Sequence, residues 1–271
     1  MKVHLALCGL SILTKMEQRR EPWHRQHASL AQKTQGHVER LKRSCLIPSG
    51  IVEAWREGLD PKYLDLLPLL PADISAERKS LELAGFDPCT DKVVFAVSDT
   101  PAGVLAGHLN AVALGLDPVY VDEPPPAAVG GSAAGCTVLR IRSLNPTGNL
   151  VMWDALGDLA RALVWATRIE GVDELAVNLT GGFKATIPFV IGIVEALPPT
   201  PVHSAYCLFE GSLAVISLPL RAIGGDLGGD LQALSEGRQP SQRYEGWAYE
   251  VSDGAWKLTK LGEVLDLIRR T

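Results

Sequence analysis

The sequence predicts an α/β fold: a Rossmann-like, doubly wound and mainly parallel sheet, followed by a small C-terminal appendage. Short apolar runs recur along residues 1–220, and helical patterns lie between several of them. Apolar strands that alternate with helices indicate a parallel sheet covered by helices on both faces. The composition, 46% hydrophobic and 21% charged, is that of an ordinary globular protein with a sizeable core. We expect one domain over 1–220 and a small module over 221–271.

The predicted strands are short apolar runs. In chain order they cover residues 4–7, 92–97, 118–121, 138–141, 174–178, 202–209 and 213–218. The spacing of apolar residues predicts helices over 103–114, 152–169 and 184–197. Residues 14–70, between the first two strands, resemble an insertion: the stretch is charged, is predicted to be helical near 51–58, and ends in a Pro-rich segment.

The appendage begins with a change of composition. Residues 221–237 contain two Gly-Gly-Asp repeats, which is typical of a linker. Residues 247–251 and 256–258 then flank Ser252-Asp253-Gly254, which predicts a hairpin, and a helix is predicted over 259–270. Strand, turn, strand and helix fit the wing and last helix of a winged-helix module, and fit an α/β dimerisation module equally well.

Composition also excludes several classes of protein. A net charge of −5 argues against a general surface for long nucleic acids. No apolar run reaches the roughly 18 residues that cross a bilayer, and the N-terminus indicates a first strand rather than a signal peptide. Five scattered cysteines without metal-ligand or redox spacing indicate reduced thiols in a cytoplasmic protein. We predict no metal site and no cofactor.

Small and polar residues follow three of the predicted strands at once. They are Cys8-Gly9-Leu10-Ser11, Ser98-Asp99-Thr100 and the loop from Asn178 to Lys184. In a doubly wound sheet, ligands bind at the carboxyl ends of strands where the winding direction reverses. Asp99 invites a magnesium assignment, but a lone Asp beside Ser and Thr is more often a turn residue.

The loop from Asn178 to Lys184 is the most informative of the three. Gly181-Gly182 lets the backbone approach an anion closely, and a helix that begins near Lys184 directs unpaired N–H groups toward the same point. Thr180 adds a hydroxyl and Lys184 a full positive charge. The pattern predicts a phosphate cradle, although a plain tight turn with a solvated lysine remains the alternative. It matches neither the P-loop nor the dinucleotide fingerprint.

Four segments in the same order resemble the CARF (CRISPR-associated Rossmann fold) family over about residues 1–220. They are Leu7 to Thr14, Ser98-Asp99-Thr100, Asn178 to Ala185, and Phe209-Glu210-Gly211-Ser212 with Ile216-Ser217-Leu218-Pro219. The sequence departs from this pattern at Lys15, where the nearest relatives lead us to expect Asn. It departs again in the Arg- and His-rich stretch 17–43.

This resemblance implies a homodimer that binds cyclic oligoadenylate, most naturally cyclic tetra-adenylate, across a two-fold interface. Some CARF proteins are ring nucleases, which cleave this second messenger of type III CRISPR defence. The implied cleavage is metal-independent: a ribose 2′-OH attacks the adjacent phosphate and leaves a 2′,3′-cyclic phosphate. Lys184 would neutralise the developing charge, and Ser11 would hold the attacking oxygen. Further ligand-binding candidates are Gly9, Leu10, Thr14, Ser98, Asp99, Thr100, Asn178, Thr180, Gly181, Gly182 and Phe183.

Two other functions stay open. One is a transcription regulator gated by cyclic oligoadenylate, whose C-terminal module binds DNA, and the other is a sensor subunit without catalysis. Arg19 with His24 and Arg20 with His27 satisfy the Arg-x(4–6)-His spacing of HEPN ribonucleases, but Pro22 interrupts any helix there. We expect the stretch 17–43 to be a basic flap over the ligand instead.

Overall fold

The computed structural model describes residues 1–18, 47–58, 72–125, 135–142, 144, 149–182, 184–197, 201–209, 212–218, 220, 225–240, 249–252 and 254–259. The chain divides into two compact units, Met1–Leu218 and Pro219–Thr271. The expected basic flap over 17–43 and the two Arg–His pairs fall almost entirely outside the described residues, as does the expected C-terminal helix over 259–270.

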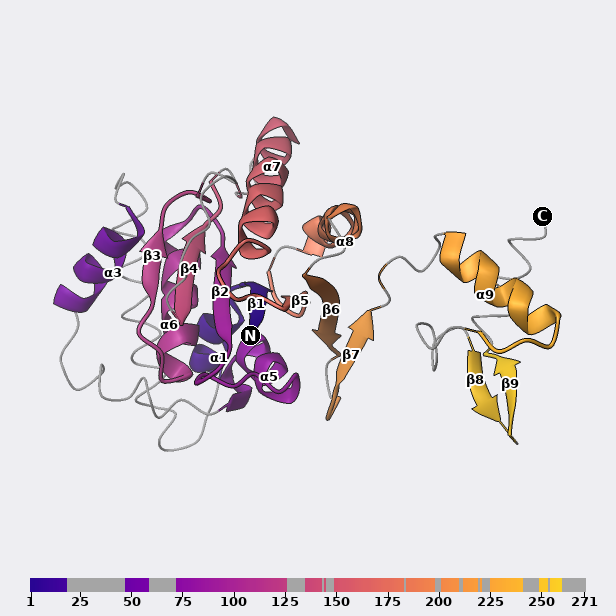
Figure 1. Ribbon diagram of the computed structural model, residues 1–271. Coiled ribbons are helices and arrows are strands. Elements are labelled where there is room, and N and C mark those ends of the chain that lie inside the picture. Colours follow the sequence, from indigo (N-terminus) through magenta and orange to yellow (C-terminus); the bar gives the residue numbers. More distant parts are fainter. Residues whose placement is uncertain are drawn as a thin grey trace. The chain divides into compact units, whose positions relative to one another are not determined.

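The first unit is built on a seven-stranded sheet in the order β3-β4-β2-β1-β5-β6-β7 (Figure 1). The strands are β1 (Lys2–Leu7), β2 (Lys92–Val97), β3 (Val119–Val121), β4 (Cys136–Arg140), β5 (Glu174–Asn178), β6 (Val202–Leu208) and β7 (Val215–Leu218). Neighbours pair in parallel except β6 and β7, which are antiparallel. The mainly parallel α/β fold predicted from the sequence is therefore confirmed.

Helices α1 (Ser11–Gln18), α3 (Pro48–Glu57), α5 (Ala76–Leu83) and α6 (Pro101–Ala113) pack together on one face of the sheet. Helices α7 (Asn149–Ala166) and α8 (Ile187–Ala196) pack against each other on the opposite face. Two short 3₁₀ turns, η2 (Ala72–Ile74) and η3 (Lys184–Thr186), precede α5 and α8. Alternate residues of the central strands, such as Val93, Phe95 and Val97, enter the core under the first group of helices.

The winding direction reverses between β1 and β5. From β1 the chain moves outward through β2 to the edge strand β3 and comes back one place to β4, and after α7 it crosses to β5 on the other side of β1. The carboxyl ends of β1 and β5 therefore meet where a doubly wound sheet places its ligand crevice. Tight packing fixes the pair, because β1 is buried from Val3 to Leu7 and β5 from Leu175 to Asn178.

Several predicted boundaries were wrong, and three of them concern the site loops or the second unit. The α-helix expected to begin near Lys184 begins at Ile187, because Pro188 suits the first turn of an α-helix and η3 precedes it. The loop expected after the first strand becomes α1 at Ser11. Residues expected to be a linker form α9 (Gly225–Ser235), since Leu231 is buried against Tyr249 despite the glycines.

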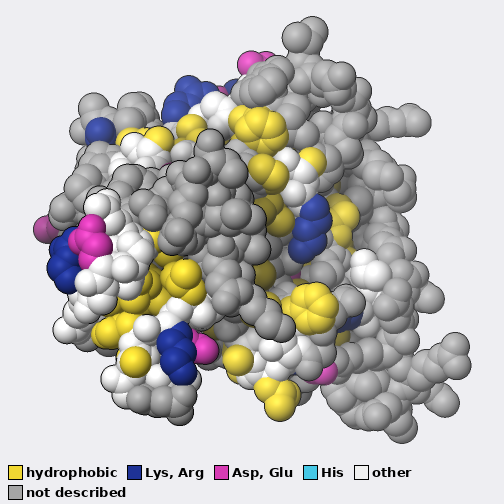
Figure 2. Space-filling model, turned by 90° about the vertical axis from the view of Figure 1, so that its right-hand side faces the viewer, with side chains coloured by type: hydrophobic (Ala, Val, Ile, Leu, Met, Phe, Trp, Pro, Cys, Tyr) yellow, Lys and Arg dark blue, Asp and Glu magenta, His cyan; other side chains and the backbone are white. Residues whose placement is uncertain are grey.

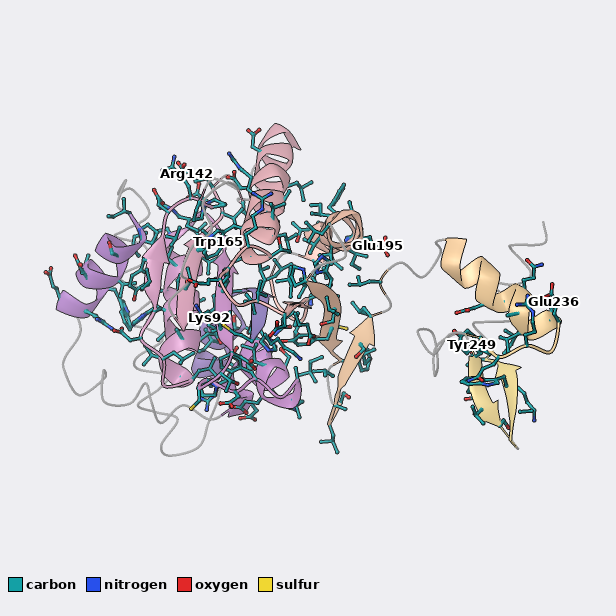
Figure 3. The ribbon with its side chains drawn as sticks, in the orientation of Figure 1. Lys92, Arg142, Trp165, Glu195, Glu236 and Tyr249 are labelled. Atoms are coloured by element: carbon teal, nitrogen blue, oxygen red, sulfur yellow. The ribbon has the colours of Figure 1, made fainter. Side chains whose placement is uncertain are left out.

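The second unit contains α9 and the predicted hairpin. Its strands are β8 (Tyr249–Ser252) and β9 (Ala255–Leu258), which pair antiparallel around Gly254 at φ 75°. Tyr249 packs edge-on against Trp256, and its hydroxyl donates to Asp230 at 2.7 Å. Figure 3 shows Tyr249 at the end of the hairpin nearest α9. Helix plus hairpin suits either type of appendage proposed above.

Candidate functional site

The loops after β1 and β5 touch each other backbone to backbone. Ala6 of β1 is in register with Asn178 of β5, so the two strands end side by side. A Cβ on Gly9 would lie 2.9 Å from the backbone N of Gly182, and a Cβ on Gly182 would lie 2.7 Å from Cβ of Leu7. Gly182 also has φ 75°. Only glycines allow this approach, and it brings together the two loops that carry Ser11 and Lys184.

The carboxylate of Glu77 fills the space between these loops. Glu77 lies near the start of α5 and its side chain has no exposed surface. Oε1 accepts a hydrogen bond from the Gly9 amide at 2.8 Å. Oε2 accepts from the hydroxyls of Ser11 at 2.6 Å and Ser75 at 2.9 Å. A buried carboxylate requires such partners because its desolvation is costly, and Glu77 has three.

Glu77 also explains why residue 181 is glycine. A Cβ at Gly181 would lie 1.9 Å from Oε1 of Glu77 and 2.7 Å from its Cγ. The Gly-Gly turn therefore lies against a carboxylate of the protein itself, whereas the sequence predicted the close approach of a phosphate. Ser11 begins α1, so this carboxylate also lies at the positive end of that helix dipole.

Asn178 and Thr180 hold the second loop in place. The amide of Asn178 donates to Ser80 Oγ at 2.7 Å, and its Oδ1 accepts from the Thr180 amide at 3.0 Å. The Thr180 hydroxyl accepts from the amide of Leu208 at 2.9 Å. Both side chains are buried, so each has a clear structural role at the mouth of the sheet.

Lys184 is an exposed residue of η3. Its Nζ donates to the backbone oxygen of Thr180 at 2.7 Å, so the side chain folds back over its own loop. An ammonium has three protons, and this bond uses one of them. The neighbouring candidate Phe183 lies outside the described residues.

On the other loop, Leu10 and Thr14 are exposed, and the Thr14 hydroxyl bonds the backbone oxygen of Leu10 at 3.3 Å. Lys15, one turn after Ser11, donates to the backbone oxygen of Asp73 at 3.3 Å. Ser11, Thr14 and Lys15 belong to the first turns of α1, at the same edge of the sheet as Lys184.

The third predicted loop is a helix cap. The Thr100 hydroxyl accepts from the Gly103 amide at 3.0 Å and pairs with Ser98 Oγ at 3.0 Å, which caps α6. Asp99 lies 3.7 Å from the guanidinium of Arg140. Within the described residues, no group of three or more His, Cys, Asp or Glu side chains could hold a metal ion.

Sequence reasoning missed two groups of residues. Glu77 and Ser75 are the first, although Ser75 gives a readable signal because it caps α5 by accepting from the Arg78 amide at 3.2 Å. The second is an ion-pair cluster at the ends of β3 and β4, where Arg140 and Arg142 both bond Asp122 at 2.6 and 2.7 Å. Burial opposes ionisation of Asp122, but these hydrogen bonds outweigh it and lower its pKa. Figure 3 places Arg142 at this edge.

On the face in Figure 2, the Lys and Arg side chains of the described residues lie apart from one another among hydrophobic patches. In the part of the chain that the structure describes, no helix is long and apolar enough to cross a membrane.

Comparison with known proteins gave one result. No curated protein matches the sequence. A protein-family comparison matches residues 72–221 to the CRISPR-associated protein family Cas_APE2256. The matched region spans more than half of the chain and includes Glu77, the loop from Asn178 to Lys184 and β7. The chain therefore belongs to the CRISPR-associated protein family Cas_APE2256.

Proposed function

We propose that this protein is a ring nuclease of CRISPR defence, which binds cyclic tetra-adenylate and cleaves it without a metal ion. One observation carries the proposal: the glycine-to-glycine contact that joins the Ser11 loop to the Lys184 loop at the reversal point of the sheet. Ligands of doubly wound folds bind at this position. Membership of a CRISPR-associated family supports a role in that defence, and the resemblance to CARF proteins supplies the ligand class.

The contacts at the site limit the positions at which a phosphate could bind. Glu77 already uses the Gly9 amide and the Ser11 proton, and a buried carboxylate would repel a second anion placed beside it. A phosphate is therefore expected on the outer side of the loop, where two ammonium protons of Lys184 have no partner among the described residues. Lys15 offers a second cation one turn along α1.

In the proposed reaction, the 2′-oxygen of one ribose forms a bond to the adjacent phosphorus while the bond to the 5′-oxygen breaks. The 2′-hydroxyl proton passes to solvent, and the departing 5′-oxygen takes one from solvent. Lys184 stabilises the extra charge on the phosphorane, and Ser11 holds the 2′-oxygen in line. Slow turnover follows, because no histidine of the described residues stands at these two loops to act as a base.

A two-fold symmetric ring calls for a two-fold symmetric site. One chain presents a single copy of Ser11 and Lys184, so a dimer would present both pairs to one ring. Exposed hydrophobic side chains near the far end of the sheet offer apolar surface for assembly: Phe189 on α8, Val202 on β6, Phe209 directly after β6, and Ile216 on β7.

The second candidate is a ligand-gated regulator or sensor. The observation in its favour is the separate unit Pro219–Thr271, in which a helix packs on a hairpin without any residue of the proposed ring site. Such a unit could pass on a binding event that involves no cleavage.

Cleavage separates these candidates. Purified protein would be incubated with cyclic tri-, tetra- or hexa-adenylate in EDTA and the products identified by mass spectrometry. We expect cyclic tetra-adenylate to give linear di-adenylate with a 2′,3′-cyclic phosphate, equally with and without EDTA. Lys184→Ala should abolish cleavage and weaken binding by about 1–3 kcal/mol. Tight binding without cleavage would favour the regulator or sensor, and products that carry a 5′-phosphate would refute attack by the 2′-OH.

A further inference from the structure

The hydroxyl of Ser11 has its only proton engaged inside the protein. It donates that proton to Glu77 Oε2 at 2.6 Å, a short distance typical of a charge-assisted bond. A serine hydroxyl has one donor and two acceptor lone pairs. With the proton directed inward, Ser11 can offer a ligand only its lone pairs.

The carboxylate of Glu77 is held in place, so it stays where it accepts the hydrogen bond from Ser11. Oε1 is fixed by the Gly9 amide, and Oε2 is shared with the hydroxyl of Ser75, which is itself fully buried. Gly181 lies so close to the same carboxylate that a Cβ there would be 1.9 Å from Oε1, and the Glu77 side chain therefore has no room to rotate. The orientation of the Ser11 hydroxyl is therefore set by the fold before any ligand arrives.

We infer that Glu77 is a positioning residue that makes Ser11 an obligatory hydrogen-bond acceptor, so that Ser11 selects a ribose 2′-hydroxyl and not a phosphate oxygen. A 2′-hydroxyl is a donor and suits the lone pairs of Ser11, whereas a phosphate oxygen is an acceptor and does not. This inference rests on the proposed function, because it takes a ribonucleotide ring as the ligand. It adds a residue that the Ser11–Lys184 pair alone does not include.

Glu77→Gln is the direct test because it reverses the polarity with little change of shape. The Gln oxygen must stay where it accepts from the Gly9 amide, so its NH₂ group faces Ser11 and donates to it. The Ser11 proton is then free to point toward the ligand. Glu82→Gln is the matched control, since Glu82 lies on the same helix but is exposed and bonds Arg78 at 3.0 Å.

The measured quantity is a ratio of dissociation constants, that of 2′-fluoro cyclic tetra-adenylate over that of the native ring. Fluorine occupies the place of the hydroxyl but cannot donate. Binding would be followed by stopped flow on ice, within the first seconds, before cleavage. We expect the wild-type ratio to exceed that of Ser11→Ala by about tenfold, which corresponds to one lost hydrogen bond. Glu77→Gln should lose most of that difference, and Glu82→Gln should keep it. Effects of fluorine on the sugar itself are common to all variants and cancel.

The outcomes separate the two proposals. If the rings bind wild type but Glu77→Gln keeps the wild-type ratio, the inference about Glu77 is overturned and the ring site stands. If neither ring binds wild type, the proposed function falls and the inference falls with it. Should Glu77→Gln fail to fold, Ser11→Ala alone decides: equal weakening of both rings would show that Ser11 does not meet the 2′-hydroxyl.

Discussion

Gly181→Ala tests whether the carboxylate of Glu77 really fills the space between the two loops. The new methyl group would lie 1.9 Å from Oε1 of Glu77 and 2.5 Å from its Cδ, so one of the two side chains must move. An exposed carboxylate would simply swing away. Glu77 cannot, because it is fully buried and accepts three hydrogen bonds of 2.6 to 2.9 Å.

The expected cost has two parts. Overpacking a tight interior costs about 1–3 kcal/mol, and breaking at least one hydrogen bond to the carboxylate costs about 1.5–3 kcal/mol. We therefore expect the free energy of unfolding to fall by about 2.5–6 kcal/mol. Gly192→Ala is the matched control: it lies within α8 with no atom near its added Cβ, and should stabilise by about 0.5–1 kcal/mol.

Urea unfolding followed by tryptophan fluorescence measures both variants. A loss below about 1 kcal/mol in Gly181→Ala would refute the reasoning, since a side chain that moves aside so cheaply is not held as described. A double-mutant cycle gives a sharper check. In a Glu77→Ala background the Cβ of residue 181 has room, so the same substitution should cost little, and an equal cost in both backgrounds would exclude the contact as its cause.

Three further predictions concern other buried groups. Burial lowers the pKa of His4 to about 4 and that of His108 to about 3, below the unfolded value of 6.5. As the pH falls, the unfolded chain therefore binds protons before the folded protein does, and the free energy of unfolding should fall by about 2–4 kcal/mol between pH 7 and pH 5. Urea midpoints that do not change across this range would contradict this prediction. Burial also raises the pKa of Cys136 to about 12, so a thiol reagent on native protein should label exposed Cys89 before Cys136, as peptide mapping would reveal. Labelling of Cys136 before Cys89 would be the contrary result. Asn178→Leu leaves the amide two residues later without its acceptor and should cost about 1–3 kcal/mol in urea, whereas unchanged stability would deny that bond its role.

The sheet was the most predictable part of the molecule. A strand buried on both faces is a nearly continuous apolar run, and β2 (Lys92–Val97) and β5 (Glu174–Asn178) were placed at exactly those residues from the sequence. The edge strands were placed less accurately because they are short and half exposed: β7 begins two residues later than expected. The same logic located the strand ends that carry Ser11 and Lys184.

The helices that were missed have weak apolar patterns. Helix α5 has the sequence AERKSLEL, and among its buried residues only Leu81 is hydrophobic, because the helix presents Glu77 and Ser80 to the interior. Helix α9 contains three glycines and was taken for a linker. In both helices, tertiary contacts outweigh the weak helical preference of the local sequence.

Glu77 could not be found from sequence because acidic residues are almost never fully buried without partners. Its partners come from three separated segments, at Gly9 and Ser11, at Ser75, and against Gly181. The sequence predicted that Gly181-Gly182 would approach a phosphate. Which anion it approaches in the free protein became clear only once the fold brought α5 beneath the two loops.

The central claim is a two-fold symmetric ligand site where the winding direction of the sheet reverses, between β1 and β5. The stoichiometry of ring binding tests this claim most directly. The Ser11→Ala variant would be titrated with cyclic tetra-adenylate by calorimetry, since it should bind the ring without cleaving it, while sedimentation measures assembly. We predict a dimer before ligand is added and one ring bound for every two chains. A monomer that binds one ring per chain, or no binding of the ring at all, would contradict the account.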